Sequence, residues 1–405
     1  MEGVKTIAFE IVAALGDAPD RVYVLVGGGG LLAGLWRGFE EARRLGWSAR
    51  VWPILLRRRC MPMRGEPSEI PVETPIAEFS LEAVPPRTKR RLRLVIDRTP
   101  DGQTLSFPAL VARGAPGKTL LVTGGVHGDE YEGPVAIQDV FAALDPQAMR
   151  GVFLGVPVTN GPAFAAATRE GHWDHQNLAR IFPGRPDGTL SERIAHAYAT
   201  YLVPPADLLL DIHSGGNAYA IHPLAGYQIR PGDVGRIQRA AAVAFGLKFV
   251  WGTSALPGRS LSAAGDHGVP AIYVEMPGEG RCRPEDRVTT VRGIGNVLAF
   301  LGIIEEPVSS DVSPDVVETQ EEGSGHLQVD HPSPTSGLFV PAVDVWTRVT
   351  EGQHLGEVRD PDGRVLAEVT AARNGRVLFL RTLPRVFAGD CLAFVLAGAP
   401  AGGEA

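Results

Sequence analysis

Two segments of this 405-residue chain end an apolar run with histidine and carboxylate side chains. In the first, LLVTGGVHGDEYEG, Glu130 lies three residues after His127. In the second, LLLDIHSG, His213 closes the apolar run and Asp211 lies two residues before it. Two histidines and one carboxylate leave a fourth position of a zinc ion open for water. Such a set is typical of metal-assisted hydrolysis, so we expect one zinc ion per chain on His127, Glu130 and His213.

A second interpretation of these residues needs no metal. Asp211 and His213 lie on the same side of a strand, so they could form a buried hydrogen bond only. In the metal interpretation, Asp211 orients the imidazole of His213 instead. Asp129 is expected to cap a helix or to support a ligand rather than to bind metal. Four further histidines compete for a role in the site but are expected in surface loops or in substrate contacts: His172, His175, His222 and His267.

The elements that must position these residues alternate between strand and helix in the central part of the chain, as in an α/β protein. Sites in open α/β sheets form beyond the carboxyl ends of strands, where His127, Asn160, His213 and Glu275 are expected. A hairpin turn is expected at Thr99–Gly102. The expected strands are Leu92–Asp97, Leu105–Ala112, Thr119–Thr123, Val152–Val158, Leu208–Ile212 and Ala271–Glu275, and the expected helices are Glu132–Leu144, Ser191–Leu202, Val234–Phe245 and Val288–Leu301.

Five segments in order, GGVHGDEYEG, VTNGPAFAAATR, NLARIFPG, DLLLDIHSG and AIYVEMPGEG, carry a family resemblance over about Leu92 to Leu301. Together they resemble the succinylglutamate desuccinylase/aspartoacylase family of the zinc carboxypeptidase clan. The resemblance implies an α/β fold with a mixed sheet flanked by helices, and the same three zinc ligands. It also implies a general base at Glu275 and arginines that recognise carboxylate or carbonyl groups, here Arg169 and Arg180.

These implied roles are chemically reasonable. Glu275 would take a proton from water and give it to the leaving amine. Arg180 would stabilise the developing oxyanion, and Arg169 would pair bidentately with a substrate carboxylate. The alternative for Glu275 is a salt bridge with Arg281 or Arg283. For the two arginines, the alternative is a surface salt bridge.

The chain departs from the family pattern at two places. Asn160 is followed by Gly161-Pro162, where the family commonly has Asn-Pro. Ala179 lies between Leu178 and Arg180, where many members have asparagine. We expect Asn160 and Asn177 to contact substrate, with Asn177 partly replacing the missing amide. The loss of that amide argues against a dicarboxylic substrate such as an N-acyl aspartate.

The C-terminal part is predicted to be a separate domain. Residues 91–304 would form the deacylase domain, and residues 305–322 an acidic linker. Residues 323–398 are rich in turns and resemble the small β-barrel of lipoyl and biotinyl carriers. No lysine follows Lys248, which excludes covalent carriage on this domain. We expect it to shape the active-site entrance or to form oligomer contacts.

The N-terminal 50 residues resemble part of a threonine-synthase-like pyridoxal-phosphate enzyme, with Gly27–Gly30 as the phosphate loop. The Schiff-base lysine of such enzymes lies upstream of this motif, and Lys5 is not in it. We therefore interpret residues 1–50 as a remnant, a fusion scar or an over-extended gene model, and residues 51–90 as an irregular linker. Met61 and Met63 are plausible starts, and a chain beginning at Met63 should keep full activity.

Composition restricts the functions that are open. The net charge of −7 and the pI of about 5.8 argue against nucleic-acid binding. Apolar runs are too short to cross a bilayer, and no secretory signal is visible. The three cysteines, an odd number, favour a reduced, cytoplasmic setting.

The sequence thus predicts a metal-dependent amidohydrolase that cleaves an N-acyl amino acid or a related small N-acyl amine. A zinc carboxypeptidase acting on peptides, a non-catalytic metal-binding module and a pyridoxal-phosphate enzyme remain alternatives. Assembly into a homo-oligomer stays open.

Overall fold

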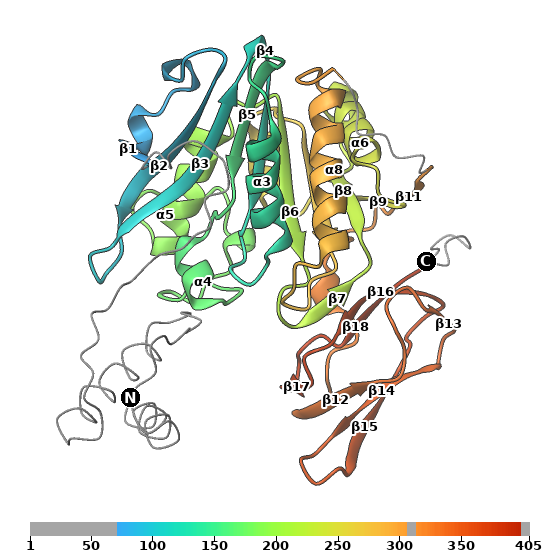
Figure 1. Ribbon diagram of the computed structural model, residues 1–405. Coiled ribbons are helices and arrows are strands. Elements are labelled where there is room, and N and C mark those ends of the chain that lie inside the picture. Colours follow the sequence, from blue (N-terminus) through green and yellow to red (C-terminus); the bar gives the residue numbers. More distant parts are fainter. Residues whose placement is uncertain (1–70, 306–312, 398–405) are drawn as a thin grey trace, which may run out of the picture. The chain divides into compact units, whose positions relative to one another are not determined.

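The computed structural model describes residues 71–305 and 313–397 (Figure 1). The predicted pyridoxal-phosphate-enzyme segment, residues 1–50, and the first half of the expected linker, residues 51–70, lie outside the described residues. Among the described helices, none is long and apolar enough to cross a membrane.

The centre of the fold is a ten-stranded mixed sheet with the order β1-β2-β3-β5-β4-β6-β10-β8-β9-β11 (Figure 1). Strands β5, β4, β6 and β10 run parallel to one another, so their carboxyl ends lie at one edge. Strand β8 is antiparallel to β10. The strands are β1 (Val72–Pro75), β2 (Thr88–Arg98), β3 (Thr104–Arg113), β4 (Ala115–Gly124), β5 (Arg150–Val156), β6 (Leu208–Ser214), β8 (Leu224–Gln228), β9 (Phe249–Thr253), β10 (Ala271–Met276) and β11 (Asp315–Glu318).

Helices cover both faces of this sheet. Apolar residues of α3, α6 and α8 pack in one core with Leu120 and Val122 of β4. Residues of α5 and α7 pack in a second core with Leu121, whose side chain points to the opposite face. The central strands are therefore apolar at successive positions because both faces are buried. The helices are α3 (Glu132–Ala143), α4 (Gly161–Ala166), α5 (Leu190–Ala197), α6 (Gly232–Phe245), α7 (Ser260–Asp266) and α8 (Pro284–Phe300).

The predicted α/β fold is confirmed, and all six expected strands and all four expected helices overlap elements of the structure. The expected hairpin is also present, with the Gly102 amide donating to the Thr99 carbonyl at 2.9 Å. The prediction missed β8 and β9, which are five residues each and contain Gly226 and Gly252. It also missed the short helices α4 and α7.

The sheet extends beyond the expected deacylase segment at both ends. Strand β1 lies in the segment 51–90 that was expected to be irregular, and it pairs parallel with β2. Strand β11 lies in the expected linker 305–322 and pairs parallel with β9. Val316 and Val317 of β11 pack against different cores, which explains why an otherwise acidic segment joins the sheet.

The C-terminal part consists of two antiparallel sheets around their own apolar core, as predicted for an all-β domain. One sheet has the order β15-β14-β12-β17 and the other has β13-β16-β18. Strand β7 (Tyr219–Ile221), from the loop after β6, pairs with β16 and so joins the two parts. The C-terminal strands are β12 (Gly337–Pro341), β13 (Arg348–Val349), β14 (His354–Arg359), β15 (Val365–Thr370), β16 (Gly375–Arg381), β17 (Arg385–Val386) and β18 (Ala393–Leu396).

Candidate active site

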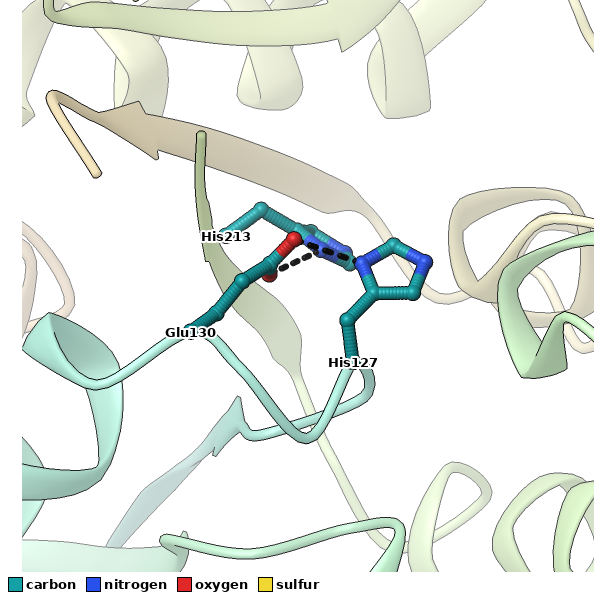
Figure 2. A group of neighbouring side chains, drawn as sticks. All are labelled: His127, Glu130 and His213. Atoms are coloured by element: carbon teal, nitrogen blue, oxygen red, sulfur yellow. Dashed lines mark hydrogen bonds and ion pairs between the residues drawn. The ribbon is translucent and has the colours of Figure 1, made fainter. Parts of the chain in front are cut away.

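The side chains of His127, Glu130 and His213 converge at the carboxyl edge of the sheet (Figure 2). One potential ligand atom from each residue lies within 4.8 Å of the other two. The Glu130 carboxylate lies between the rings, with Oε1 2.7 Å from His127 Nδ1 and Oε2 3.0 Å from His213 Nδ1. The structure therefore brings together the three predicted ligands, from positions up to 86 residues apart in the numbering of the chain.

Local backbone geometry positions the first two of these residues. Strands β4 and β6 are parallel neighbours, so the loop after β4 lies beside the end of β6 that carries His213. Gly125 turns this loop with a φ of +59°, which L side chains rarely adopt. At Gly128, an added Cβ would lie 2.0 Å from the carbonyl carbon of Ala163, so only glycine fits.

The two imidazoles use their other nitrogens for hydrogen bonds. The Nε2 of His127 lies 3.0 Å from Asn177 Oδ1, and the Nε2 of His213 lies 3.1 Å from Asp211 Oδ2. Each oxygen can accept a hydrogen bond from a protonated Nε2, which leaves the Nδ1 lone pair directed to the shared centre. Asp211 thus lies where a residue that orients His213 is needed.

Burial and neighbouring charges shift the pKa values of these three groups in different directions. Burial lowers the pKa of His127 to about 4, which favours the neutral imidazole that binds metals. The pKa of Glu130 falls well below its ordinary value, because both imidazoles outweigh the opposing effect of burial. For His213, the carboxylates of Asp211 and Glu130 overcome burial and raise the pKa.

Glu275 lies beside the three convergent residues. Strand β10 is parallel to β6, and the register pairs Glu275 with His213. Burial raises the pKa of the Glu275 carboxyl to about 7. Within the described ranges it forms no ion pair, and Arg283, a predicted alternative partner, pairs with Glu279 and Asp286 instead. A carboxyl with a pKa near neutrality, next to a potential metal centre, is suited to proton transfer.

A cavity opens over these residues. Its wall contains His127, Glu130, His213 and Glu275, together with three arginines. Two of the arginines, Arg169 and Arg180, were predicted from the sequence, and the third is Arg259. The site therefore combines a carboxyl group of raised pKa with a cationic wall that suits an anionic substrate.

The predicted arginines differ in their surroundings. Burial lowers the pKa of Arg180 to about 9, and its Nη1 donates to the carbonyl of Ala179 at 3.0 Å. Arg169 lies 3.3 Å from Glu130 Oε1 through Nη1, while its buried Nε has no hydrogen-bond partner among the described residues. Within the part of the chain that the structure describes, neither arginine takes part in an exposed salt bridge, the alternative interpretation.

A model of the succinylglutamate desuccinylase/aspartoacylase catalytic domain matches residues 116–301. A relative named N-alpha-acetyl-L-2,4-diaminobutyric acid deacetylase, from Halomonas elongata, is 35% identical over 297 residues. The match covers 71% of this chain and 85% of that relative. The chain belongs to the succinylglutamate desuccinylase/aspartoacylase family. The named relatives are deacylating hydrolases, which supports amide-bond hydrolysis by this family member as well.

Solved structures agree with this membership. A succinylglutamate desuccinylase from a Silicibacter species superposes with a TM-score of 0.68 at 30% identity, covering 77% of this chain and 96% of that one. The product-bound ectoine utilization protein EutE (DoeB) of Ruegeria pomeroyi gives a TM-score of 0.67 at 31% identity, with 76% and 94% covered. These structures align with 76–77% of this chain, so the shared fold extends beyond residues 116–301, which the catalytic-domain model matches.

The N-terminal resemblance is also found by comparison. A model of pyridoxal-phosphate-dependent enzymes matches residues 1–93, and a threonine synthase of Synechocystis is 45% identical over 51 residues. That match covers 13% of this chain and 13% of the threonine synthase. Residues 72–75 and 88–93 of the matched range form β1 and the start of β2 of the deacylase sheet.

Two residues predicted to bind substrate are placed differently from the rest. Asn160 is fully buried at the start of α4, where its Oδ1 accepts from the Ala163 amide at 3.2 Å. Asn177 accepts from the Ala179 amide at 3.0 Å and contacts His127. Neither is part of the cavity wall. Asparagine at the start of a helical turn satisfies free amides there, which accounts for the Oδ1 contacts of both residues. The buried Nδ2 of Asn160 has no hydrogen-bond partner among the described residues.

The sequence analysis missed Arg259 and Tyr273, which line the cavity. Arg259 directly follows the turn after β9, and its buried Nε has no partner among the described residues. Tyr273 lies two residues before Glu275 on the same side of β10, and its ring occupies the space over Gly226. Recognition of β9 would have indicated Arg259, and the period of two along β10 would have indicated Tyr273.

The competing histidines lie apart from the cavity wall. His222 stacks on Trp346 of the C-terminal part, with ring centroids 3.8 Å apart and an interplanar angle of 11°. His172 packs against the edge of Trp173. His267 follows the last residue of α7. None of these three belongs to the convergent group of potential metal ligands among the described residues.

Proposed function

We propose that this protein hydrolyses the amide bond of an N-acyl amino acid, with one zinc ion on His127, Glu130 and His213 and with Glu275 as the general base. The observation that carries the proposal is the convergence of these three side chains beside Glu275 in one cavity. Relatives named as a deacetylase and a desuccinylase support the reaction class.

The donor set fits zinc. Zinc binds imidazole nitrogen and carboxylate oxygen, and catalytic sites commonly use three protein ligands. Both imidazoles have an acceptor at Nε2, so both can offer Nδ1 to a metal ion. When bound there, zinc would lower the pKa of water and polarise the amide carbonyl, which allows hydrolysis near neutral pH.

The protein's own groups would handle the protons and charges. Glu275 takes a proton from the attacking water and gives it to the nitrogen of the leaving amine. Its pKa of about 7 allows both transfers near neutral pH. Arg180, inside the cavity wall, would stabilise the negative charge that develops on the carbonyl oxygen.

Two arginines would bind the carboxylate of the substrate. The Nε atoms of Arg169 and Arg259 are buried without a hydrogen-bond partner in the described chain. A buried donor without a partner is costly, and a bound carboxylate would satisfy it. Asn160 and Asn177 would then act indirectly, by holding α4 and His127 in place.

The first candidate substrate is N-α-acetyl-L-2,4-diaminobutyrate, because the 35% identical relative carries the name of its deacetylase. Other N-acetyl amino acids belong to the same proposal. Ala179 removes an amide from the site, which argues against dicarboxylic substrates. Cys282 and Cys391 form no disulfide among the described residues, which supports a reducing, cytoplasmic setting.

Amine release from a panel of substrates tests the proposal. The zinc-loaded protein is given N-α-acetyl-2,4-diaminobutyrate, other N-acetyl amino acids, N-succinyl glutamate and short peptides. We expect turnover of an N-acetyl amino acid and its loss in Glu275→Gln. Turnover of peptides alone would make the protein a carboxypeptidase, and zinc binding without turnover of any compound would favour a binding module.

A further inference from the structure

A second group of polar side chains lies behind His213, outside the proposed ligand set. Asp211 is fully buried, yet its carboxylate has three side-chain partners. Oδ1 accepts from Thr123 Oγ1 at 2.7 Å. Oδ2 accepts from the Nε2 of His213 at 3.1 Å and also from the hydroxyl of Ser260.

These partners come from three elements that meet under the site. Thr123 of β4 is paired in register with Asp211 of β6. The Thr123 hydroxyl also lies 3.2 Å from the Tyr198 hydroxyl. Ser260 is the first residue of α7 and is 4% exposed. A buried carboxylate needs hydrogen-bond donors to both oxygens if it is to keep one orientation, and Asp211 has them.

The turn that leads into α7 directs the side chains of Arg259 and Ser260 to two different sites. Gly258, with a φ of +77°, packs against the Arg180 carbonyl, where an added Cβ would lie 2.2 Å from the oxygen. The Gly258 carbonyl also accepts from the Phe182 amide at 3.1 Å. This fixed turn places Arg259 in the cavity wall and the Ser260 hydroxyl against Asp211.

We propose that Ser260 is a positioning residue for the metal centre, acting through Asp211 on His213. The inference rests on the proposed function, because it takes His213 as a zinc ligand. With Ser260 and Thr123 both donating, Asp211 is held where it accepts a hydrogen bond from the Nε2–H group of His213. That bond fixes the tautomer in which His213 Nδ1 carries a lone pair for the metal.

The expected consequence is weaker zinc binding when the hydroxyl is removed. Loss of a group that orients a metal ligand weakens metal affinity by about 10- to 100-fold. Ser260 acts through Asp211, so we expect about tenfold weaker zinc affinity in Ser260→Ala. We expect the same direction in Thr123→Val, which keeps the side-chain shape but removes the donor to Oδ1.

Two further variants serve as controls. Arg259→Met changes the neighbouring residue, and should raise KM while leaving zinc affinity unchanged. Thr290→Val removes a buried hydroxyl that donates to the Asp286 carbonyl on α8, away from the site, and should change neither zinc affinity nor KM. The two controls separate loss of the Asp211 contact from general loosening of the loop or core.

The test is competition for zinc between the full-length protein and a chromophoric chelator, with thermal unfolding of the metal-free proteins as a check of folding. Weaker zinc binding in Ser260→Ala and Thr123→Val, with wild-type zinc affinity in both controls, supports the inference. Wild-type affinity in a folded Ser260→Ala overturns it. If Ser260→Ala does not fold, wild-type affinity in Thr123→Val overturns it. A wild-type protein that binds no zinc refutes the proposed metal centre itself.

Discussion

The proposed general base predicts a specific dependence of the reaction on pH. Glu275 must be ionised to accept a proton from water. Burial raises the pKa of its carboxyl to about 7. A raised carboxyl pKa means that the active, ionised form is lost as the pH falls through that value. The rate should therefore fall on the acidic side of neutrality, and kcat/KM should follow the ionised fraction.

The magnitude follows from the pKa. With a value of about 7, roughly half of the carboxyl is ionised at pH 7, about one-tenth at pH 6 and about one-hundredth at pH 5. A bound cation would shift the whole limb to lower pH without changing its slope of one. Glu275→Gln should lower kcat by about 10²- to 10⁴-fold, or about 2.7–5.5 kcal/mol, and leave zinc content unchanged.

The assay is amine release from an N-acetyl amino acid between pH 5 and 9, with zinc content measured in each sample. Zinc content separates loss of the base from loss of the metal. A kcat/KM that shows no acidic limb of slope one, down to the lowest pH at which zinc occupancy stays full, would refute the role of Glu275. So would a Glu275→Gln variant that keeps more than one-tenth of the wild-type kcat.

Three further substitutions test the surrounding residues. Arg180→Met should lower kcat by about 10²- to 10³-fold with little change in KM; a change in KM alone would make it a substrate anchor instead. Arg259→Met should raise KM by about 10- to 100-fold, since a charge-assisted hydrogen bond contributes about 1.5–3 kcal/mol; an unchanged KM for anionic substrates contradicts this. Gly128→Ala should lower both the Tm and the zinc affinity, because the added Cβ meets Ala163 at 2.0 Å. The matched Gly161→Ala has no atom within 4 Å of its Cβ and should be tolerated; equal effects in the two variants would contradict the steric argument.

The convergence of the three potential ligands could be predicted from the sequence. His127 and His213 each follow a long apolar run, and such runs form buried parallel strands whose carboxyl ends meet at one edge. Glu130, three residues after His127, returns to the same place through a glycine-containing loop. The spacing within each motif was therefore enough, although 86 positions separate His127 from His213.

The positions of Arg259 and Tyr273 in the site could not be predicted from the pattern of apolar and polar residues. Strand β9 is short and interrupted by Gly252, so the turn that bears Arg259 was not recognised as the end of a strand. Tyr273 faces the cavity only because Gly226 on the neighbouring strand leaves room for its ring. The space beside a side chain on a strand depends on which strands pair. Strand β8 pairs antiparallel with β10, although α6, β9 and α7 lie between them in the sequence.

The two asparagines illustrate a different difficulty. An asparagine after a strand is compatible with substrate binding and with capping of the next helical turn. Asn160 caps α4, and Asn177 begins the turn that carries Arg180. Side-chain direction decides between the two uses, and the sequence alone does not fix it. Similarly, the acidic composition of 305–322 concealed β11, whose two valines pack on the cores.

The most direct test of the account measures metal content and turnover on the same protein. The full-length chain is freed of metal with a chelator, and zinc is returned stepwise while amine release from an N-acetyl amino acid is followed. We expect activity to be absent at first, to rise linearly and to reach its maximum at one zinc per chain. Full turnover by the metal-free protein would contradict the central claim, as would a His213→Ala variant that binds zinc and works like the wild type.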